Sequence, residues 1–272
     1  MTTLGEALAF ARQRIDRLDA RLLLQYATGC THADLLARPE TPVIGPAFAQ
    51  FADWVARRAA GEPLAYLVGE SEFRGRVFQV SPAVLIPRPE TEVLLDLALE
   101  RLAGRQSPDV VDLGTGSGIV AISLALECPE ARVSAVDLSP GALAVARNNA
   151  GRLGTKVDFH EGDWFAPLAG RQFDLIVSNP PYVNAESVAR LPPEYLHEPE
   201  LALGSGDDGL DFTRIILREA RKHLTDHGIL VVEIGHNREA LEAAYPTLPF
   251  TWLDTAAGDE YVFLLHAADL PA

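Results

Sequence analysis

The chain has 272 residues, which is long enough for one α/β domain plus a small second domain with a well-buried core. Its 23 basic and 38 acidic residues give a formal net charge of −15, which opposes nucleic-acid binding because such binding is driven largely by Lys and Arg against phosphate. The chain has no run of about 18 apolar residues, no signal-peptide features at its start and no C-x-x-C pair formed by Cys30 and Cys128, so we expect a cytoplasmic protein without a membrane span.

Residues 1–70 are predicted to form a small helical domain. Apolar residues recur there at three- and four-residue spacings over 7–15, 18–26 and 48–58, which is typical of amphipathic helices. Between these segments, Thr28-Gly29 marks a break.

The spacing of apolar residues along the chain then changes over residues 72–84. Apolar residues flank Arg74-Gly75-Arg76 there, which indicates a β-hairpin. We take residues 71–86 as a connector and 87–272 as the catalytic domain. Pro89 is predicted to begin the first helix of that domain, over 90–103, because proline is favoured in a first helical turn.

Residues 109–122 have the layout of a first βα unit in a nucleotide-binding sheet: an apolar strand, a glycine-rich turn and an apolar helix start. The residues of this turn are Gly114, Thr115, Gly116, Ser117 and Gly118. A second strand, 131–137, ends in Asp137, about 20 residues downstream, where a carboxylate can accept hydrogen bonds from both hydroxyls of a ribose. By itself this pattern also suits a dinucleotide-dependent oxidoreductase.

The spacing within the turn favours a different cofactor. A dinucleotide site requires G-x-G-x-x-G, whereas this turn is G-x-G-x-G and follows Asp112. A carboxylate at that position suits a cationic ligand without phosphate, which points to S-adenosylmethionine. A third strand over 157–160 leads to Trp164, which we expect to pack on the face of an adenine, with a core or lid aromatic as the alternative.

A rigid turn follows the next buried strand, predicted over 173–178. It consists of Asn179, Pro180, Pro181 and Tyr182. The two prolines fix the backbone and remove two N–H donors. The turn therefore presents an Asn amide, free carbonyl groups and an aromatic ring, which together can bind and stack on a planar NH2 group.

The remaining pattern completes an α/β fold. Further elements are predicted over 139–153 (helix), 209–224 (helix), 228–234 (buried strand), and 251–254 with 261–265, an antiparallel pair around Gly258-Asp259. Alternation of strands and helices predicts a Rossmann-like, mostly parallel sheet with helices on both faces and a terminal antiparallel hairpin. The long segment 192–209 is a candidate substrate loop.

No metal site is expected. His223 and His227 stand four residues apart but lack a third ligand at a suitable spacing. The acidic residues Glu198, Asp207, Asp208 and Asp211 are predicted to form a solvated loop in preference to a metal site.

Residues 61–266 resemble the protein N5-glutamine methyltransferases. The resemblance is carried by residues 63–69, 85–92, 112–118 and 178–182, and residues 18–24 and 35–40 resemble the family's N-terminal helical domain. It implies a class I S-adenosylmethionine-dependent methyltransferase fold. It also implies methylation of the glutamine in the Gly-Gly-Gln motif of peptide-chain release factors, with residues 1–70 recognising that partner.

Two segments resemble a sister enzyme instead. Residues 191–201 and 249–253 are similar to the enzyme that methylates a glutamine of a large-subunit ribosomal protein, and Glu200 stands where release-factor enzymes often have arginine. We expect a release factor as substrate and keep the ribosomal protein as the alternative. A third possible function is methylation of the amino groups of adenine or cytosine in nucleic acid, which the negative net charge opposes. A fourth is a noncatalytic binding module.

The chemistry follows from the weak nucleophilicity of an amide nitrogen. We expect the Asn179 side-chain oxygen and the Pro180 carbonyl to accept the two N–H bonds of the substrate amide, which orients its nitrogen. Tyr182 is expected to pack on the amide plane, and Pro181 to keep the turn rigid.

Overall fold

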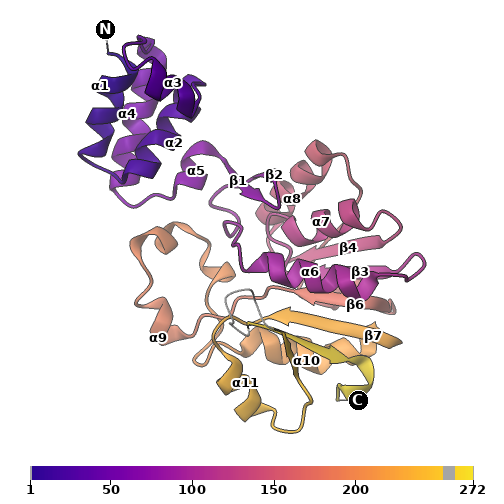
Figure 1. Cartoon of the computed structure of the whole chain (residues 1–272). Coiled ribbons are helices and arrows are strands. Elements are labelled where there is room, and N and C mark those ends of the chain that lie inside the picture. The colour runs from indigo at the N-terminus through magenta and orange to yellow at the C-terminus, as the bar shows by residue number, and fades with distance from the viewer. Residues whose placement is uncertain (1, 254–260, 272) are drawn as a thin grey trace. The chain divides into compact units, whose positions relative to one another are not determined.

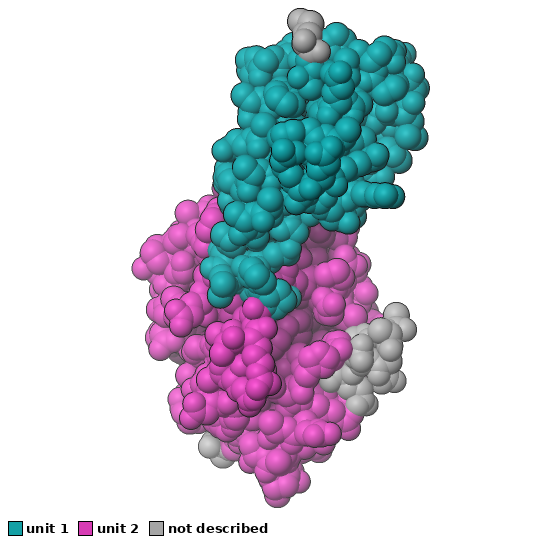
Figure 2. Space-filling view, turned by 90° about the vertical axis from the view of Figure 1, so that its left-hand side faces the viewer, with its two compact units in different colours: residues 1–70, 192–197 teal, residues 71–191, 198–272 magenta. Residues whose placement is uncertain are grey.

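The computed structural model describes residues 2–253 and 261–271. The chain divides into two compact units, one of residues 1–70 and 192–197 and the other of residues 71–191 and 198–272 (Figure 2). Among the described residues, none of the helices combines the length and apolar character that a membrane span requires.

The first unit is helical. Its helices are α1 (Leu4–Arg12), α2 (Arg17–Thr28), α3 (His32–Ala37), α4 (Gly45–Ala59) and α5 (Leu64–Val68). Thr3 and Glu6 form a capping box that begins α1, and Gly29 ends α2 in the left-handed conformation. The sequence pattern missed α3 and α5, which at six and five residues are too short to show a period.

Part of the predicted substrate loop belongs to this helical unit. The 3-10 helix η2 (Pro193–His197) is held by Arg58 on α4, which pairs with Glu194. The same guanidinium pairs with Asp19 on α2 at 2.6 Å. Residues 198–209 belong to the second unit, so the long connection is divided between the two.

The second unit is built on a mostly parallel sheet with the strand order β5-β4-β3-β6-β7-β9-β8 (Figure 1). The strands are β3 (Asp109–Leu113), β4 (Arg132–Asp137), β5 (Asp158–Glu161), β6 (Phe173–Ser178), β7 (Leu224–Glu233), β8 (Thr251–Leu253) and β9 (Val262–His266). β3 to β7 pair in parallel, whereas β9 pairs antiparallel with both β7 and β8. The expected antiparallel pair is present. Its connection at 254–260, with the predicted turn Gly258-Asp259, lies outside the described residues.

Helices cover both faces of this sheet, as the sequence predicts. The helices of this unit are α6 (Thr91–Leu102), α7 (Ile119–Glu127), α8 (Pro140–Leu153), α10 (Asp211–His223) and α11 (Arg238–Ala244), with α9 (Ala185–Val188) apart from the sheet (Figure 1), and the 3-10 helices are η1 (Ala166–Leu168), η3 (Glu200–Ala202) and η4 (Ala267–Asp269). Successive strand residues face opposite sides. Val110 of β3 packs in one core with α6 and α7, and its neighbour Val111 packs in a second core with α10 and α11.

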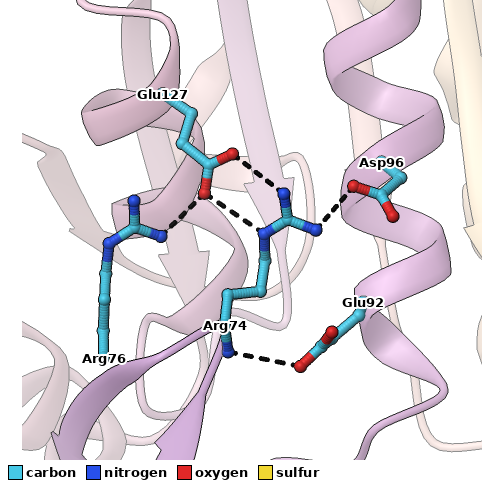
Figure 3. Close-up of polar contacts among 5 residues, drawn as sticks. All are labelled: Arg74, Arg76, Glu92, Asp96 and Glu127. Atoms are coloured by element: carbon cyan, nitrogen blue, oxygen red, sulfur yellow. Dashed lines mark hydrogen bonds and ion pairs between the residues drawn. The ribbon is translucent and has the colours of Figure 1, made fainter.

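A short hairpin precedes α6, and ion pairs connect it to two helices of this unit. It consists of β1 (Glu70–Phe73) and β2 (Arg76–Gln79). Figure 3 shows Arg74 at its turn between Glu127 on α7 and Asp96 on α6, with N–O distances of 3.0 and 2.5 Å. Arg76 pairs with the same Glu127 at 2.7 Å. The turn is therefore fixed to both helices.

The order of the strands places a crevice where ligands bind in such sheets. β3 has β4 on one side and β6 on the other, so the chain reverses the direction in which it adds strands. Ligands of open α/β sheets bind at the carboxyl ends of the strands at this switch point. The glycine-rich turn after β3 and Asn179 after β6 both lie there.

Candidate active site

A cavity of about 190 Å³ opens at the carboxyl ends of β3, β4 and β6. Eight of the predicted site residues line it: Gly114, Thr115, Gly116, Ser117, Asp137, Trp164, Asn179 and Pro181. Gly118, Pro180 and Tyr182 are not among the lining residues. The structure therefore brings the glycine turn, the carboxylate, the indole and the Asn-Pro-Pro-Tyr turn to one place.

The glycine turn holds its shape through left-handed backbone angles and hydrogen bonds to β4. Gly114 and Gly116 have φ of 72° and 56°, which glycine adopts without steric cost. The N–H groups of Gly114 and Thr115 both donate to the Val136 carbonyl, at 2.9 and 3.0 Å. A Cβ at Gly116 would meet nothing within 4 Å, so a ligand can approach the backbone closely there.

Gly118 has a different reason to be glycine. It caps α7 with φ of 84°, and a Cβ there would lie 2.8 Å from Ile122 Cδ1 and 3.1 Å from Ala146 Cβ. Its missing side chain thus lets the start of α7 pack against α8. This places Gly118 in the packing behind the turn.

Asp112 fastens the turn to the start of α7. Its Oδ2 accepts the Thr115 hydroxyl at 2.6 Å and the Ala121 N–H at 3.2 Å. Complete burial, with a smaller repulsion from Asp137, raises the pKa of Asp112 to about 7. Because Asp112 also lines the cavity, a cationic ligand would favour its charged form.

Asp137 connects two loops at the end of β4. Its Oδ2 accepts the Gly116 N–H at 2.8 Å, and its Oδ1 accepts the Ser139 N–H at 2.9 Å. Burial raises the pKa of Asp137, although these backbone hydrogen bonds oppose the rise. A carboxylate offers about four lone-pair sites, so both oxygens retain capacity for a ligand's hydroxyls.

Trp164 forms a flat wall of the cavity. Its backbone has φ of 46°, and its ring lies 5.2 Å from the Phe212 ring between centroids. A Cβ built on Gly114 would lie 3.8 Å from Trp164 Cζ3, so the indole packs beside the turn. Trp164 also packs against the second core. Trp164 therefore contacts both the second core and the cavity, and its packing on an adenine stays a prediction.

The Asn-Pro-Pro-Tyr turn is anchored on its inner side. Asn179 Nδ2 donates to Thr91 Oγ1 at 3.0 Å. Its side-chain oxygen therefore stays available as an acceptor, and Asn179 is one of the residues that line the cavity. Pro180 is buried, and within the described residues no hydrogen bond reaches its carbonyl oxygen. This turn thus retains the two acceptors that its sequence predicts.

Tyr182 faces the end of β7. Its hydroxyl lies 3.4 Å from Glu233 Oε1, and a Cβ on Gly235 would stand 2.6 Å from its ring. Burial, together with the charge of Glu233, raises the pKa of Tyr182 above its usual value. Tyr182 is therefore packed firmly into the protein.

Sequence reasoning missed two residues behind this turn, Thr91 and Glu233. Glu233 is 1% exposed, and burial, the largest cause, raises its pKa to about 7. A lone acidic residue ending the buried run 228–234 was a signal that could have identified it.

The prediction that Glu198 belongs to a solvated acidic loop is wrong. Its side chain is 2% exposed and pairs with Arg88, and its Oε2 accepts the Ile86 N–H at 3.2 Å. The pairing stabilises the buried charge and joins two segments that line the cavity, 83–88 and 199–202. Within the described residues, no group of three or more His, Cys, Asp or Glu could hold a metal ion.

The fold and this cavity define a class I S-adenosylmethionine-dependent methyltransferase. The same fold is found in the Thermus thermophilus 16S rRNA N2 G1207 methyltransferase in complex with AdoMet and guanosine. That structure is 22% identical and covers 72% of this chain and 49% of its own, with a TM-score of 0.54. Family models match residues 91–196 (Methyltransferase small domain) and residues 3–69 (PrmC N-terminal domain).

Two kinds of relative are similar over most of the chain. A release factor glutamine methyltransferase from Moorella thermoacetica is 44% identical over 245 residues, which cover 87% of each chain. A ribosomal protein uL3 glutamine methyltransferase from Neisseria gonorrhoeae is 50% identical over 221 residues, which cover 79% of this chain and 74% of the relative. The chain belongs to this family of glutamine methyltransferases, and its cofactor is S-adenosylmethionine.

Proposed function

We propose that this enzyme methylates the side-chain nitrogen of the glutamine in the Gly-Gly-Gln motif of peptide-chain release factors. The observation that carries the amide chemistry is the hydrogen bond from Asn179 to Thr91. Because one N–H of the Asn179 NH2 donates to that hydroxyl, the NH2 is turned toward Thr91 and the side-chain oxygen is the group left to accept from a substrate beside the cofactor cavity. An acceptor there suits the NH2 of a primary amide.

The cofactor would lie along the glycine turn. Gly114, Thr115, Gly116 and Ser117 border it, with Gly118 supporting the turn from behind. Asp137 would accept the ribose hydroxyls, and Trp164 would pack on the adenine. The bound cofactor supplies an electrophilic methyl group on a sulfonium.

The protein's part in the reaction is orientation. Asn179 Oδ1 and the Pro180 carbonyl would accept the two N–H bonds of the glutamine amide and aim its nitrogen at the methyl carbon. The two acceptors would offset the positive charge that develops on the amide nitrogen as it takes up the methyl group that the cofactor would supply. The proton then passes from nitrogen to solvent. Pro181 would keep the turn rigid, and Tyr182 would border the amide plane.

One family match, together with one general principle, supports a release factor as the substrate. The match to the PrmC N-terminal domain covers residues 3–69, and recognition of a whole protein is usually spread over a broad interface. We therefore assign the helical unit to binding the release factor. Residues 1–70, 71–86 and 87–272 would then serve as recognition domain, connector and catalytic domain.

The second candidate substrate is ribosomal protein uL3. The relatives with that name reach 50% identity, and residues 191–201, which follow the catalytic turn in the sequence, resemble them. Nucleic acid is a weaker candidate because of the net charge of −15.

Parallel reactions separate these substrates. Purified release factor and purified uL3 are each incubated with the enzyme and with methyl-labelled S-adenosylmethionine. We expect label on the release factor, and none on a release factor whose Gly-Gly-Gln glutamine is replaced. Label on uL3 alone would overturn the choice of substrate while leaving the glutamine chemistry intact.

A further inference from the structure

A buried polar chain runs behind the Asn-Pro-Pro-Tyr turn. Thr91, the first residue of α6, is 1% exposed and accepts the Asn179 Nδ2–H at 3.0 Å. Its side chain also lies close enough to Glu233, at the end of β7, to stabilise the charged form of that carboxyl. Three elements distant in sequence, α6, β6 and β7, thus meet through their side chains.

The same carboxyl lies near the other end of the turn. Glu233 Oε1 stands 3.4 Å from the Tyr182 hydroxyl, and Glu233 Oε2 is buried without a hydrogen-bond partner among the described residues. Asn179 is thus held by Thr91, which lies beside Glu233, and the Tyr182 hydroxyl lies next to the same carboxyl.

The direction of these hydrogen bonds matters for an asparagine. A 180° rotation of its amide exchanges oxygen and NH2, so a hydroxyl neighbour, which can donate or accept, does not fix the orientation by itself. An ionised carboxylate only accepts, and Glu233, whose pKa burial raises to about 7, is mostly in that form above this pH. A threonine hydroxyl that donates to the carboxylate must offer its lone pairs to Asn179, and the Asn179 oxygen then turns toward the cavity.

We propose that Thr91 and Glu233 are positioning residues that fix the Asn179 side-chain oxygen as the acceptor for the substrate amide. This inference rests on the proposed function, because it concerns how Asn179 receives a glutamine. Neither residue is required to touch the reacting atoms. Their effect is on turnover, through the population of correctly oriented Asn179.

The test compares isosteric replacements of two buried threonines. Thr91→Val removes the hydroxyl that accepts from Asn179, whereas Thr91→Ser retains it. Thr213→Val on α10 is the matched control, because the Thr213 hydroxyl is fully buried and has no hydrogen-bond partner within the described part of the chain. All are assayed as the full chain, with whichever of release factor and uL3 the parent enzyme methylates.

We expect kcat of Thr91→Val to fall about tenfold or more, as for the loss of one orienting hydrogen bond. Because Thr91 also lines the cavity, the affinity for S-adenosylmethionine is measured as well, and it should change far less than kcat. Thr91→Ser should retain most of the activity, and Thr213→Val should match the parent. Glu233→Gln should also lower kcat. The new amide N–H can donate to the Thr91 hydroxyl, so the hydroxyl no longer has to accept from Asn179 and the Asn179 amide can take either orientation. Parent-like turnover in Thr91→Val would overturn the inference and leave the proposed function standing.

A substrate-free measurement keeps the inference testable if neither protein is methylated. The side-chain NH2 signals of Asn179, assigned by their loss in Asn179→Ala, should be protected from hydrogen exchange in the parent and in Thr91→Ser. They should lose that protection in Thr91→Val. Equal protection in all three proteins would contradict the orientation by Thr91.

Discussion

Asp137 accepts the backbone N–H of Gly116 at 2.8 Å, which ties the end of β4 to the glycine-rich turn that follows β3. Its second oxygen accepts the N–H of Ser139, the residue whose side chain caps the start of α8. One carboxylate therefore shapes two sides of the cofactor cavity, and it retains lone pairs to which the hydroxyls of a ligand could donate. This relationship makes Asp137 the first target for testing cofactor binding.

Replacement of Asp137 by alanine should weaken S-adenosylmethionine binding by roughly 1–3 kcal/mol, the scale of hydrogen bonds to a charged acceptor. Isothermal titration calorimetry measures this loss. Circular dichroism spectra and melting curves must show that the variant remains folded, because the mutation also removes the bonds to Gly116 and Ser139. Parent affinity in a folded variant would rule out the assignment to the ribose.

Asn179→Ala should separate chemistry from cofactor binding. Loss of its side-chain oxygen removes an acceptor that matters most in the transition state, so turnover should fall on the order of 10²-fold or more. Affinity for S-adenosylmethionine, measured by calorimetry, should change far less. A variant that methylates at the parent rate would refute the role of the Asn-Pro-Pro-Tyr turn.

Replacement of two glycines by alanine should change the stability of the protein in opposite directions. Gly118→Ala puts a Cβ 2.8 Å from Ile122 Cδ1 at a left-handed position, and we expect a loss of about 1–3 kcal/mol in unfolding free energy. Gly151→Ala, inside α8 with nothing within 4 Å of the new Cβ, should stabilise by about 0.4–1 kcal/mol. Urea unfolding measures both. An unchanged unfolding free energy in Gly118→Ala would contradict the tight packing of α7 on α8.

The buried acids predict a pH dependence of stability. Glu233 and Asp112 have pKa values raised from 4.5 and 3.8 to about 7, so the folded protein binds more protons than the unfolded chain between those values. Their contribution to stability is complete below about pH 4 and is lost as the pH rises through about 7.

Glu233→Gln removes one of these acids and serves to test this dependence. Relative to the parent, it should gain about 3 kcal/mol in unfolding free energy between pH 4 and pH 8. Urea titrations at several pH values measure the difference. A constant offset between the two proteins across this range would show that Glu233 does not titrate as its burial implies.

The parts of the site that could be predicted from sequence are local ones. The glycine turn and Asn-Pro-Pro-Tyr each follow directly after a strand, and the carboxyl ends of parallel strands meet at one edge of the sheet. Thr91 and Glu233 approach them only through the packing of α6 and the order of β6 and β7, which a single sequence does not display. The error at Glu198 has the same origin, since an acidic residue in a polar loop gives no sign of the arginine that buries it.

The measurement that tests the central claim most directly is tandem mass spectrometry of a release factor after reaction with this enzyme and S-adenosylmethionine. We predict one added methyl group on the side-chain nitrogen of the Gly-Gly-Gln glutamine, absent when the enzyme carries Asn179→Ala. A release factor that remains unmodified under conditions in which uL3 is methylated, or a methyl group on any other residue of the release factor, would contradict the account.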